Sequence, residues 1–443
     1  MSARSMTQPV ATSYLADILQ DARARTLELV AGLDAEQLMG PRLKIVNPLR
    51  WEIGHVSWFH EKFILRDIYE QAPHYPPGDE IYDSIEIPHE VRWDLPLLTM
   101  EDTLAFMENV LDRCLSRLGT GMASEADSYM YQFATFHEDM HTEAYTYSRQ
   151  TLAYPEPVFA NAIHPGAAGA LPGDVSVPGG TFQLGSRKDE PIIFDNEKWA
   201  HPVAVEPFDI ARAPVTNADY RAFVDAGGYG IRELWCKDGW DWRQEHDADH
   251  PVYWQRTGEG DWAVRRFDAV QDLAPDQPVI HVNWYEANAY CRWANRRLPS
   301  EVEWEVAALG EPTADGSALA DVKRTNPWGD APRATTNCNL DGRALGVVDV
   351  AALPESDSAF GCRQMLGNVW EWTADVFGPF EGFSPDAYKD YSKPVFYETK
   401  ILRGGAWATR SRMVTGRYRN FFTPDRRDVL AGFRTCAVSD KLH

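Results

Sequence analysis

QFATFHEDMHTEAYTYSRQ, residues 132–150, is the stretch from which the fold of the first half of the chain can be predicted. It contains neither Pro nor Gly and is followed by Tyr154-Pro155, so it predicts one helix of about five turns. His137 and His141 are four residues apart, which places both imidazoles on one helical face, where one metal ion can bind both. Two imidazoles do not complete a metal site, so a further ligand is expected from elsewhere in the chain.

The string HEDMH at residues 137–141 also fits the H-E-x-x-H pattern of zinc peptidases, in which the Glu, here Glu138, is the general base. A metzincin would continue with Gly and His at fixed offsets, whereas residues 142–145 read TEAY. A third interpretation is that the two His form only a hydrogen-bonded surface pair. The sequence of this helix leaves all three interpretations open.

Three other segments of the first half have helical patterns. They are YLADILQDARARTLELVAGLDAEQL at 14–38, RWEIGHVSWFHEKFIL in a helix that begins near Pro48, and residues 100–118. Together with the His-pair helix they predict an up-down four-helix bundle, whose interior is a common place for metal ligands. Residues 71–98, between two of these helices, are rich in Pro, Gly and Tyr, and a connection of this length is usually functional.

His55 is the candidate for the third ligand. It shares a helical face with Trp51, Trp58 and Phe59 and is expected to point inward, whereas His60 falls elsewhere on the helix. A lone inward His is more often a packed core residue, but a neighbouring helix with a His pair changes that balance. Three neutral imidazoles would leave open positions on the ion, and this ligand type suits Zn, Cu, Fe and Ni without choosing among them.

Length and composition limit the alternatives. A chain of 443 residues is expected to form two domains. The formal charge of −23 argues against nucleic acid and against an anionic membrane as partners, because either requires a basic surface. Six Cys without a C-x-x-C pair indicate reduced thiols, and no signal peptide or apolar run of 18 residues is present, so a cytoplasmic location is expected.

Residues 156–175 are rich in Pro, Gly and Ala and are predicted to link a helical domain at 1–155 to a second domain at 176–443. After the linker the sequence changes to short strands and turns with many Trp and Gly. Its motifs include PVIHVNWYEANAYCRWANRRLPSEVEWEVAA at 278–308, MLGNVWEWTAD at 365–375 and LRGGAWATR at 402–410. The chain is therefore predicted to be an α+β protein, with a second domain that has little regular secondary structure.

This ordered series of motifs resembles the formylglycine-generating-enzyme/sulfatase-modifying fold, a C-type-lectin-like domain, over nearly all of the second half. The oxidase that gives this fold its name needs a reactive cysteine pair shortly after the RGG strand, and residues 406–420 contain no Cys. The resemblance therefore implies the fold without that chemistry.

The two halves together resemble the ergothioneine sulfoxide synthases and the selenoneine synthases, in which a DinB-like bundle precedes such a domain. These are non-heme iron enzymes that use dioxygen to join sulfur or selenium to the imidazole C2 of hercynine, the trimethylated form of histidine. The resemblance is carried by the His pair and by NPLRWEIGHVSWF at 47–59, DAYKDYSKPVF at 386–396 and YRNFFTPDRRDVLAGFRT at 418–435.

This resemblance implies roles for individual residues. His55, His137 and His141 would hold Fe(II), and Tyr388 would match the tyrosine that donates a proton during the oxygen chemistry. Tyr391 and Asn420 would match residues that hold the ammonium and carboxylate end of hercynine. A phenol is a suitable proton donor, and aromatic faces bind a quaternary ammonium.

Three positions depart from the family pattern and bear on the chalcogen donor. Met140 stands where the familiar actinobacterial enzymes have Gln, and Phe421-Phe422 stands where they have Trp-Asp. The missing Asp would have met the charged end of γ-glutamylcysteine, so that donor is not expected. A selenosugar is favoured, with free cysteine as the alternative thiol donor, and Arg92 with Trp93 is the candidate donor contact. The sequence leaves open the oligomeric state and whether the product is an oxide or a simple ether of the chalcogen.

Overall fold

The computed structural model describes residues 8–190, 192–258 and 260–438, and the chain forms two compact units. The first unit runs to Phe159 and includes the short segment Lys188–Ile193. The second unit comprises Ala160–Arg187 and the chain from Phe194 onwards. The described residues contain no helix that is both long enough and apolar enough to cross a membrane.

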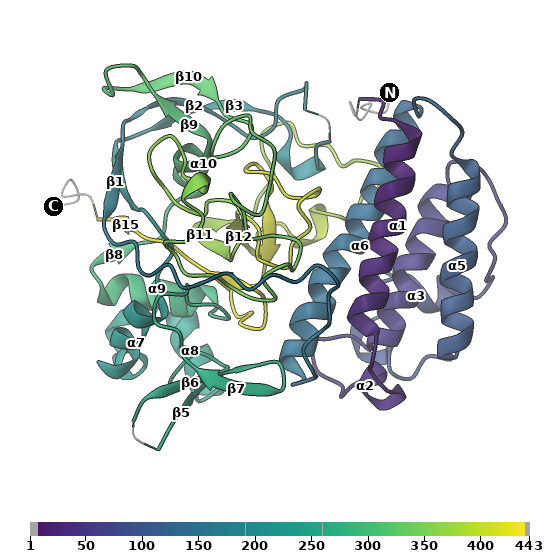
Figure 1. Ribbon diagram of the computed structural model, residues 1–443, viewed down its shortest axis with the longest axis horizontal. Helices are drawn as coiled ribbons and strands as arrows, with labels where there is room; N and C mark the ends of the chain where they lie inside the picture. Colours follow the sequence, from purple (N-terminus) through teal and green to yellow (C-terminus); the bar gives the residue numbers. More distant parts are fainter. Residues whose placement is uncertain (1–7, 191, 259, 439–443) are drawn as a thin grey trace. The chain divides into compact units, whose positions relative to one another are not determined.

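The first unit is helical. Its elements are α1 (Thr12–Val30), α2 (Ala35–Met39), α3 (Leu49–His60), the π-helical turn η1 (Glu61–Arg66), α4 (Gly78–Tyr82), the 3-10 turn η2 (His89–Val91), α5 (Met100–Arg117) and α6 (Glu125–Thr151). The long helices α1, α3, α5 and α6 run alongside one another (Figure 1), with α1 packed on α6 and α3 packed on both α5 and α6. The predicted helical bundle is confirmed.

The segment predicted as one helix over residues 14–38 is two helices. α1 ends at Val30, and Gly32 adopts a left-handed φ of +75°, which a residue with a Cβ rarely takes. Asp34 then caps α2, because its carboxylate accepts hydrogen bonds from the backbone N–H groups of Glu36 and Gln37. The Gly and Asp signals therefore override the continuous apolar periodicity.

The His-pair helix is longer than predicted. α6 begins at Glu125, and the Ser124 hydroxyl caps it by accepting from the N–H of Asp127. The Ser- and Tyr-rich lead-in joins the helix because no Pro or Gly interrupts it. The connection at residues 71–98 is not wholly irregular, since it contains α4 and η2.

The second unit consists of small sheets and short helices joined by long loops. Its strands, from β1 to β15, are Asp174–Val177, Gly180–Leu184, His201–Val205, Phe208–Ala211, Trp254–Arg256, Trp262–Arg266, Ala269–Asp272, Arg296–Arg297, Gly310–Pro312, Leu319–Lys323, Trp370–Val376, Lys400–Arg403, Asn420–Phe422, Ala431–Gly432 and Cys436–Ala437. Its α-helices are α7 (Asn217–Asp225), α8 (Lys237–Glu245), α9 (Trp284–Trp293) and α10 (Glu301–Leu309).

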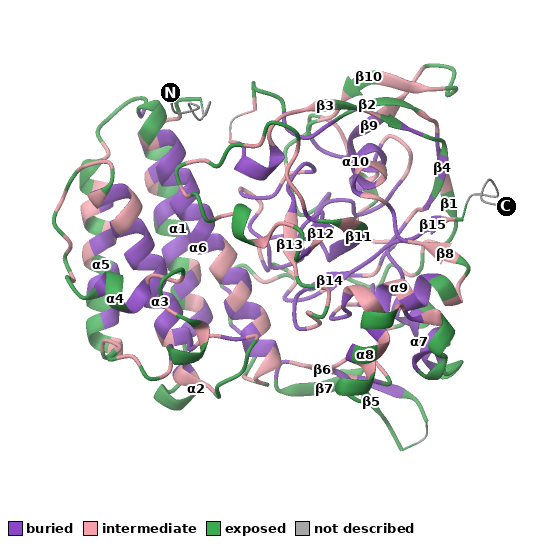
Figure 2. Cartoon of the chain, turned by 180° about the vertical axis from the view of Figure 1, so that it is seen from behind, coloured by how far each residue is buried: buried purple, intermediate pink, exposed green. Residues whose placement is uncertain are grey.

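Two four-stranded sheets organise this unit, with strand orders β1-β4-β15-β8 and β13-β12-β11-β14. β13 pairs antiparallel with β12, so that Phe421 lies opposite Ile401, while β11 and β14 are parallel. Helix α10 is buried along much of its length (Figure 2) and contributes Trp304 to an apolar cluster with residues of β1 to β4. The α+β prediction is confirmed.

The six cysteines all lie in the described part of the chain, and all are free thiols. Five are buried and Cys236 is half-buried. Burial raises the pKa of Cys338 and of Cys362 to about 11, so these thiols are protonated at neutral pH. The prediction that the chain has no disulfide framework is confirmed.

Candidate metal centre

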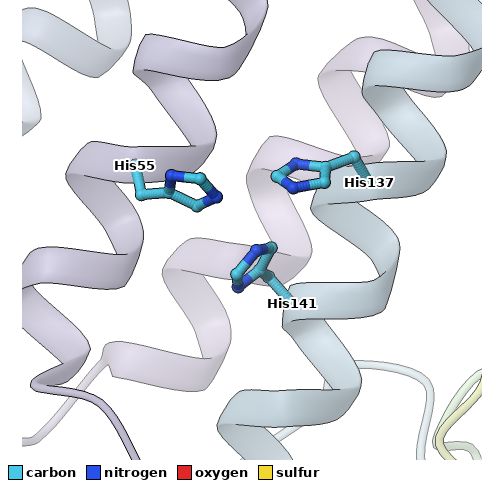
Figure 3. A group of neighbouring side chains, drawn as sticks. All are labelled: His55, His137 and His141. Carbon is cyan, nitrogen blue, oxygen red and sulfur yellow. The ribbon is translucent and has the colours of Figure 1, made fainter. Parts of the chain in front are cut away.

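Three histidines of the first unit converge in the interior of the bundle. His55 comes from α3, while His137 and His141 come from successive turns of α6 (Figure 3). One ring nitrogen from each lies within 4.8 Å of the others, a spacing that can hold one metal ion. His55 and His137 are buried, at 1% and 9% exposure, and His141 is half-buried.

Two of the three imidazoles are oriented by acceptors on the side away from the cluster. The Nδ1–H of His55 donates to the carbonyl oxygen of Tyr82 at 2.7 Å, and the Nδ1–H of His141 donates to Oε1 of Glu52 at 3.1 Å. A carbonyl and a carboxylate only accept, so each Nδ1 carries the proton and each Nε2 keeps a free lone pair. This is the arrangement in which histidine binds metal ions in proteins.

The third imidazole is held by packing. The ring of His137 stacks on Phe59, with centroids 3.7 Å apart and planes within 12°. Its Nδ1 is buried and has no hydrogen-bond partner among the described residues. His55 is stacked in the same way on Trp51, at 4.9 Å and 8°. These aromatic contacts restrict the rotation of both rings, so the cluster is preorganised for a ligand.

The surroundings keep the imidazoles of His55 and His137 uncharged. Burial, followed by the proximity of His141, holds the pKa of His55 and of His137 well below the ordinary histidine value. Both rings are therefore neutral at physiological pH. Neutral imidazole is the form that coordinates metal, so the donor set fits a divalent transition-metal ion.

Glu138 does not face this cluster, and the zinc-peptidase interpretation is wrong. Its carboxylate is fully buried on the α1 side of α6, where Arg23 Nε donates to Oε1 at 3.0 Å and the Thr26 hydroxyl donates to the same oxygen at 2.8 Å. Burial raises the pKa of Glu138, but Arg23 and His60 outweigh it and the net pKa is lowered. A carboxylate bound in this way cannot activate a water on the metal.

His60 is also separate from the triad, as predicted. Its Nε2 donates to the Ala134 carbonyl at 2.9 Å, and its Nδ1 lies 3.7 Å from Glu138 Oε2. Met140, one residue before the second histidine of the pair, is half-buried on α6.

Arg92 is buried, and the hydrogen bonds described for it are all to residues of the first unit. Nη1 donates to Asn47 Oδ1 at 2.9 Å, and Nη2 donates to the carbonyl oxygens of Ser84 and Ile87 at 3.1 Å each. Trp93 was predicted together with Arg92 to contact the chalcogen donor. Its indole N–H donates to the carbonyl oxygens of Met39 and Gly40, at the C-terminus of α2. The geometry gives these two residues structural partners within the bundle.

The other predicted site residues lie in the second unit. Tyr391 is half-buried, shares a 3.0 Å hydrogen bond with the Tyr418 hydroxyl, and stacks on Phe194 at 5.2 Å. The edge of Tyr391 meets Phe421 at 5.9 Å, and Tyr388 accepts a backbone hydrogen bond from Tyr391 at 3.3 Å. The structure therefore groups several of the predicted residues around Tyr391.

The neighbouring residues of β13 are half-buried as well. Asn420 uses its side-chain oxygen to accept from the N–H of Phe421 at 2.9 Å. Phe421 stacks on Phe377 at 4.4 Å, and the Arg426 guanidinium lies 5.2 Å from the Phe422 ring centroid. Phe421 is thus a packing residue of this aromatic group, and Phe422 has a cation above its ring.

Sequence reasoning missed the acceptors that orient the ligands. Glu52 lies three residues before His55 on α3, is 2% exposed, and was not singled out. A Glu on the inward face of an otherwise aromatic helix was the available signal, because such a group is almost never buried without a partner. The Tyr82 carbonyl carried no signal, since it is a backbone atom.

The geometry and the sequence matches together define a class of protein. Residues 18–144 match the DinB superfamily, and residues 160–438 match the sulfatase-modifying factor enzyme 1-like domain. The chain is thus a DinB-type helical bundle with a histidine cluster, followed by a domain of the sulfatase-modifying type. Within this class it belongs to the hercynine oxygenase family, and the predicted resemblance is confirmed.

The relatives cover almost the entire chain. The hercynine oxygenase of Mycolicibacterium thermoresistibile is 39% identical over 430 residues, which are 95% of this chain and 94% of the relative. That of Mycobacterium tuberculosis is 37% identical over 441 residues, or 97% and 99% of the two chains. The formylglycine-generating enzyme of Streptomyces coelicolor is 33% identical over 319 residues, or 65% of this chain and 97% of its own length.

Proposed function

We propose that the protein is a non-heme Fe(II) enzyme that uses dioxygen to form a bond between a chalcogen and the imidazole C2 of hercynine. Membership of the hercynine oxygenase family supports hercynine as the substrate. The observation that carries the proposal is the histidine cluster, in which one ring nitrogen from each of three imidazoles lies within 4.8 Å of the others. Two of these donors are oriented by buried acceptors, as expected for a functional metal centre.

The donor set supports Fe(II) as the metal. Imidazole suits several divalent metals, and three protein ligands leave open positions at which substrates can bind. Bound Fe(II) would supply the redox chemistry with dioxygen that the chain's own side chains lack. His55, His137 and His141 would hold the ion, and the aromatic rings stacked on the first two would limit the access of water to them.

Tyr388, Tyr391 and Asn420 are proposed to act on the substrate. Tyr388 is half-buried in a turn and would donate a proton from its phenol. Tyr391 and Asn420 would bind the charged end of hercynine, for which an aromatic face contributes roughly 0.5–2 kcal/mol. In support of this, Tyr391 lies in an aromatic group with Phe194 and Phe421.

The chalcogen donor is proposed to be a selenosugar, which would make the product a selenoneine-type compound. A sugar carries no ammonium or carboxylate, so it needs no acidic partner, and Phe421 and Phe422 provide none. Met140 likewise provides no amide. Free cysteine is the alternative donor, with an ergothioneine-type sulfoxide as the product.

The test is a product assay by mass with competing donors. The protein is loaded with Fe(II) without oxygen, mixed with hercynine and a selenosugar, cysteine or γ-glutamylcysteine, and then exposed to dioxygen. We expect oxygen uptake and a hercynine product heavier by selenium, with less product from cysteine and least from γ-glutamylcysteine. If the iron-loaded protein consumes no oxygen with any of the donors, the proposed function is wrong.

Tyr388→Phe provides a second readout in the same assay. Removing the hydroxyl should reduce the rate of product formation by at least about 100-fold, the lower end of what a general acid contributes. Tyr397→Phe is the matched control, because this exposed tyrosine of the same loop region is 74% accessible and is assigned no role. Equal rates for the Tyr388 variant and the wild type would remove Tyr388 from the proposal.

A further inference from the structure

Arg92 is an unusual residue for the connection between α3 and α5. An arginine that is only 8% exposed needs partners for its charge and its N–H groups. It has no carboxylate within ion-pairing distance among those described, and its bonded partners are one amide and two backbone carbonyls. The role of such a residue lies either in the stability of the fold or in the orientation of the groups that it contacts.

One line of contacts leads from Arg92 to the metal ligand His141. Nη1 donates to Asn47 Oδ1 at 2.9 Å, which fixes the orientation of the amide. The amide nitrogen of Asn47 then donates to Glu52 Oε1 at 3.3 Å. That same oxygen accepts the Nδ1–H of His141 at 3.1 Å. Arg92 is thus two hydrogen bonds away from the carboxylate that orients His141.

A second line of contacts leads from Arg92 to the metal ligand His55. The Arg92 guanidinium carbon lies 4.0 Å from the centroid of Trp51, and the Trp51 ring is stacked almost parallel on His55. The Trp51 indole N–H donates to the Ile81 carbonyl at 2.7 Å, next to the Tyr82 carbonyl that holds His55. The stack therefore restricts the tilt of the imidazole plane, within which the His55 Nδ1–H points at its acceptor.

Arg92 also holds the connection between α3 and α5 in place. Nη2 of Arg92 bridges the Ser84 and Ile87 carbonyls, so the guanidinium fixes the backbone just after α4. A planar guanidinium can donate in several directions and stack on a ring at the same time, whereas a lysine ammonium cannot. Arg92 does both, because its guanidinium donates to Asn47 and to two carbonyls and also lies over the Trp51 ring.

We propose that Arg92 is a positioning residue of the metal centre: through Asn47 and Glu52 it sets the orientation of His141, and through Trp51 that of His55. It acts on the two ligands at a distance, through these contacts. This is a different role from the donor contact expected from the sequence. The inference rests on the metal-binding part of the proposed function and is independent of which substrates are used.

The test measures binding of Co(II) alone to the full-length protein by chelator competition, together with the visible spectrum of the Co(II) complex. Arg92→Lys and Asn47→Ala are expected to weaken Co(II) binding by about 10-fold, the lower range for groups that orient metal ligands. Both should also shift the Co(II) absorption bands, because His141 is no longer held in one orientation.

The matched control is Arg50→Ala. Arg50 also anchors the connection, since its Nη2 donates to the Leu97 carbonyl at 3.0 Å, but no contact described for it reaches Asn47, Glu52 or Trp51. It should lower thermal stability without changing Co(II) affinity or spectrum. If the Arg92 and Asn47 variants lose stability but bind Co(II) like the wild type, Arg92 has only a structural role and the inference is wrong.

Asn47→Ala keeps the test decisive if Arg92→Lys does not fold, because Asn47 is half-buried and its side chain can be truncated without burying a charge. Failure of the inference is distinguishable from failure of the proposed function. Wild-type protein that binds Co(II) tightly while its product assay fails leaves the positioning role intact. Wild-type protein that binds no Co(II) overturns both.

Discussion

Two buried glutamates flank the metal ligands, and they serve opposite purposes. Glu138 follows His137 directly in sequence but faces α1, where Arg23 neutralises it. Glu52 is 89 residues away from His141 in sequence but hydrogen-bonds to it, and no Arg or Lys ion pair is described for it. The comparison teaches that the carboxylate next to the motif belongs to the fold, whereas the carboxylate far from it in sequence belongs to the site.

The physical reason lies in helix geometry. Residues one apart on an α-helix point about 100° away from each other, so Glu138 cannot share the face of His137 and His141. Residues on a facing helix can, and Glu52 of α3 does. A carboxylate that orients a metal ligand must also stay available to accept the ligand's N–H, which a tight arginine pair would oppose.

Glu138→Gln should have the largest effect on stability. It leaves the buried Arg23 charge without a carboxylate partner, and breaking a buried ion pair typically costs about 3–5 kcal/mol of unfolding free energy. Urea denaturation measures this, and the control is Glu28→Gln, which breaks a partly exposed pair with Arg25 and should cost under about 1 kcal/mol. The Glu138 variant should keep its metal; loss of metal with unchanged stability would reverse the comparison.

Gly54→Ala should disturb the Tyr82 side of the site. A Cβ on Gly54 would lie 2.4 Å from ring carbons of Tyr82, so the ring and its backbone must move. Overpacking of this kind costs about 1–3 kcal/mol, and displacement of the Tyr82 carbonyl should also weaken metal binding. Gly119→Ala is the control, since nothing lies within 4 Å of its added Cβ. Unchanged melting and metal affinity would contradict the packing described for His55.

Glu52→Gln should weaken metal affinity by about 10- to 100-fold, or about 1.4–2.7 kcal/mol, because the amide is a poorer acceptor for the His141 N–H. Glu61→Gln is the matched control: Glu61 is equally buried beside α3, but it pairs with Arg113 and contacts no ligand. The control should lose stability and keep its affinity for Co(II). Equal affinities for the two variants would mean that Glu52 is only structural.

Asp195 of the second unit is a third kind of buried carboxylate. Its Oδ1 accepts a hydrogen bond from Ser392, whereas its Oδ2 has no hydrogen-bond partner among the described residues. Burial, together with the nearby Asp386 charge, raises its pKa to about 6, although the hydrogen bond from Ser392 and the charge of Lys198 act in the opposite direction. A raised pKa means that the folded state holds a proton between about pH 4 and 6 that the unfolded state releases, so stability falls as pH rises through 6.

Asp195→Asn should remove that pH-dependent loss. At pH 7.5 the variant should be more stable than the wild type by about 1–2 kcal/mol, and at pH 4 the advantage should vanish. Thermal unfolding between pH 4 and 8 measures the difference. A variant that is less stable than the wild type at pH 7.5 would show that the ionised carboxylate is bound by a partner.

Much of the fold could be predicted from the sequence because its signals are local. Residues 100–118 were expected as a helix, and α5 spans Met100–Arg117. The spacing of His137 and His141 placed them on one face of α6, and the apolar pattern around His55 turned it inward. Prediction was wrong where two local signals competed, as at Gly32 and Asp34, which divide the segment at 14–38.

The rest of the site depends on contacts between distant residues, which periodicity does not encode. The Asn47–Glu52–His141 line and the stack of Arg92 on Trp51 join segments separated by about 40 to 90 residues, and packing decides them. Arg92 illustrates the point: its position in a long connection suggested a donor contact, and only the three-dimensional arrangement shows how its N–H groups are used. The direction of Glu138 likewise required the position of α1.

The central claim is that three histidines bind one metal ion and that Glu138 takes no part in binding it. The most direct measurement is the Fe(II) content of protein loaded without oxygen and then desalted. We predict about one iron per chain for the wild type and for Glu138→Gln, and less than about a tenth of that for His137→Ala, His141→Ala and His55→Ala. Retention of iron by the histidine variants, or its loss from Glu138→Gln, would contradict the account.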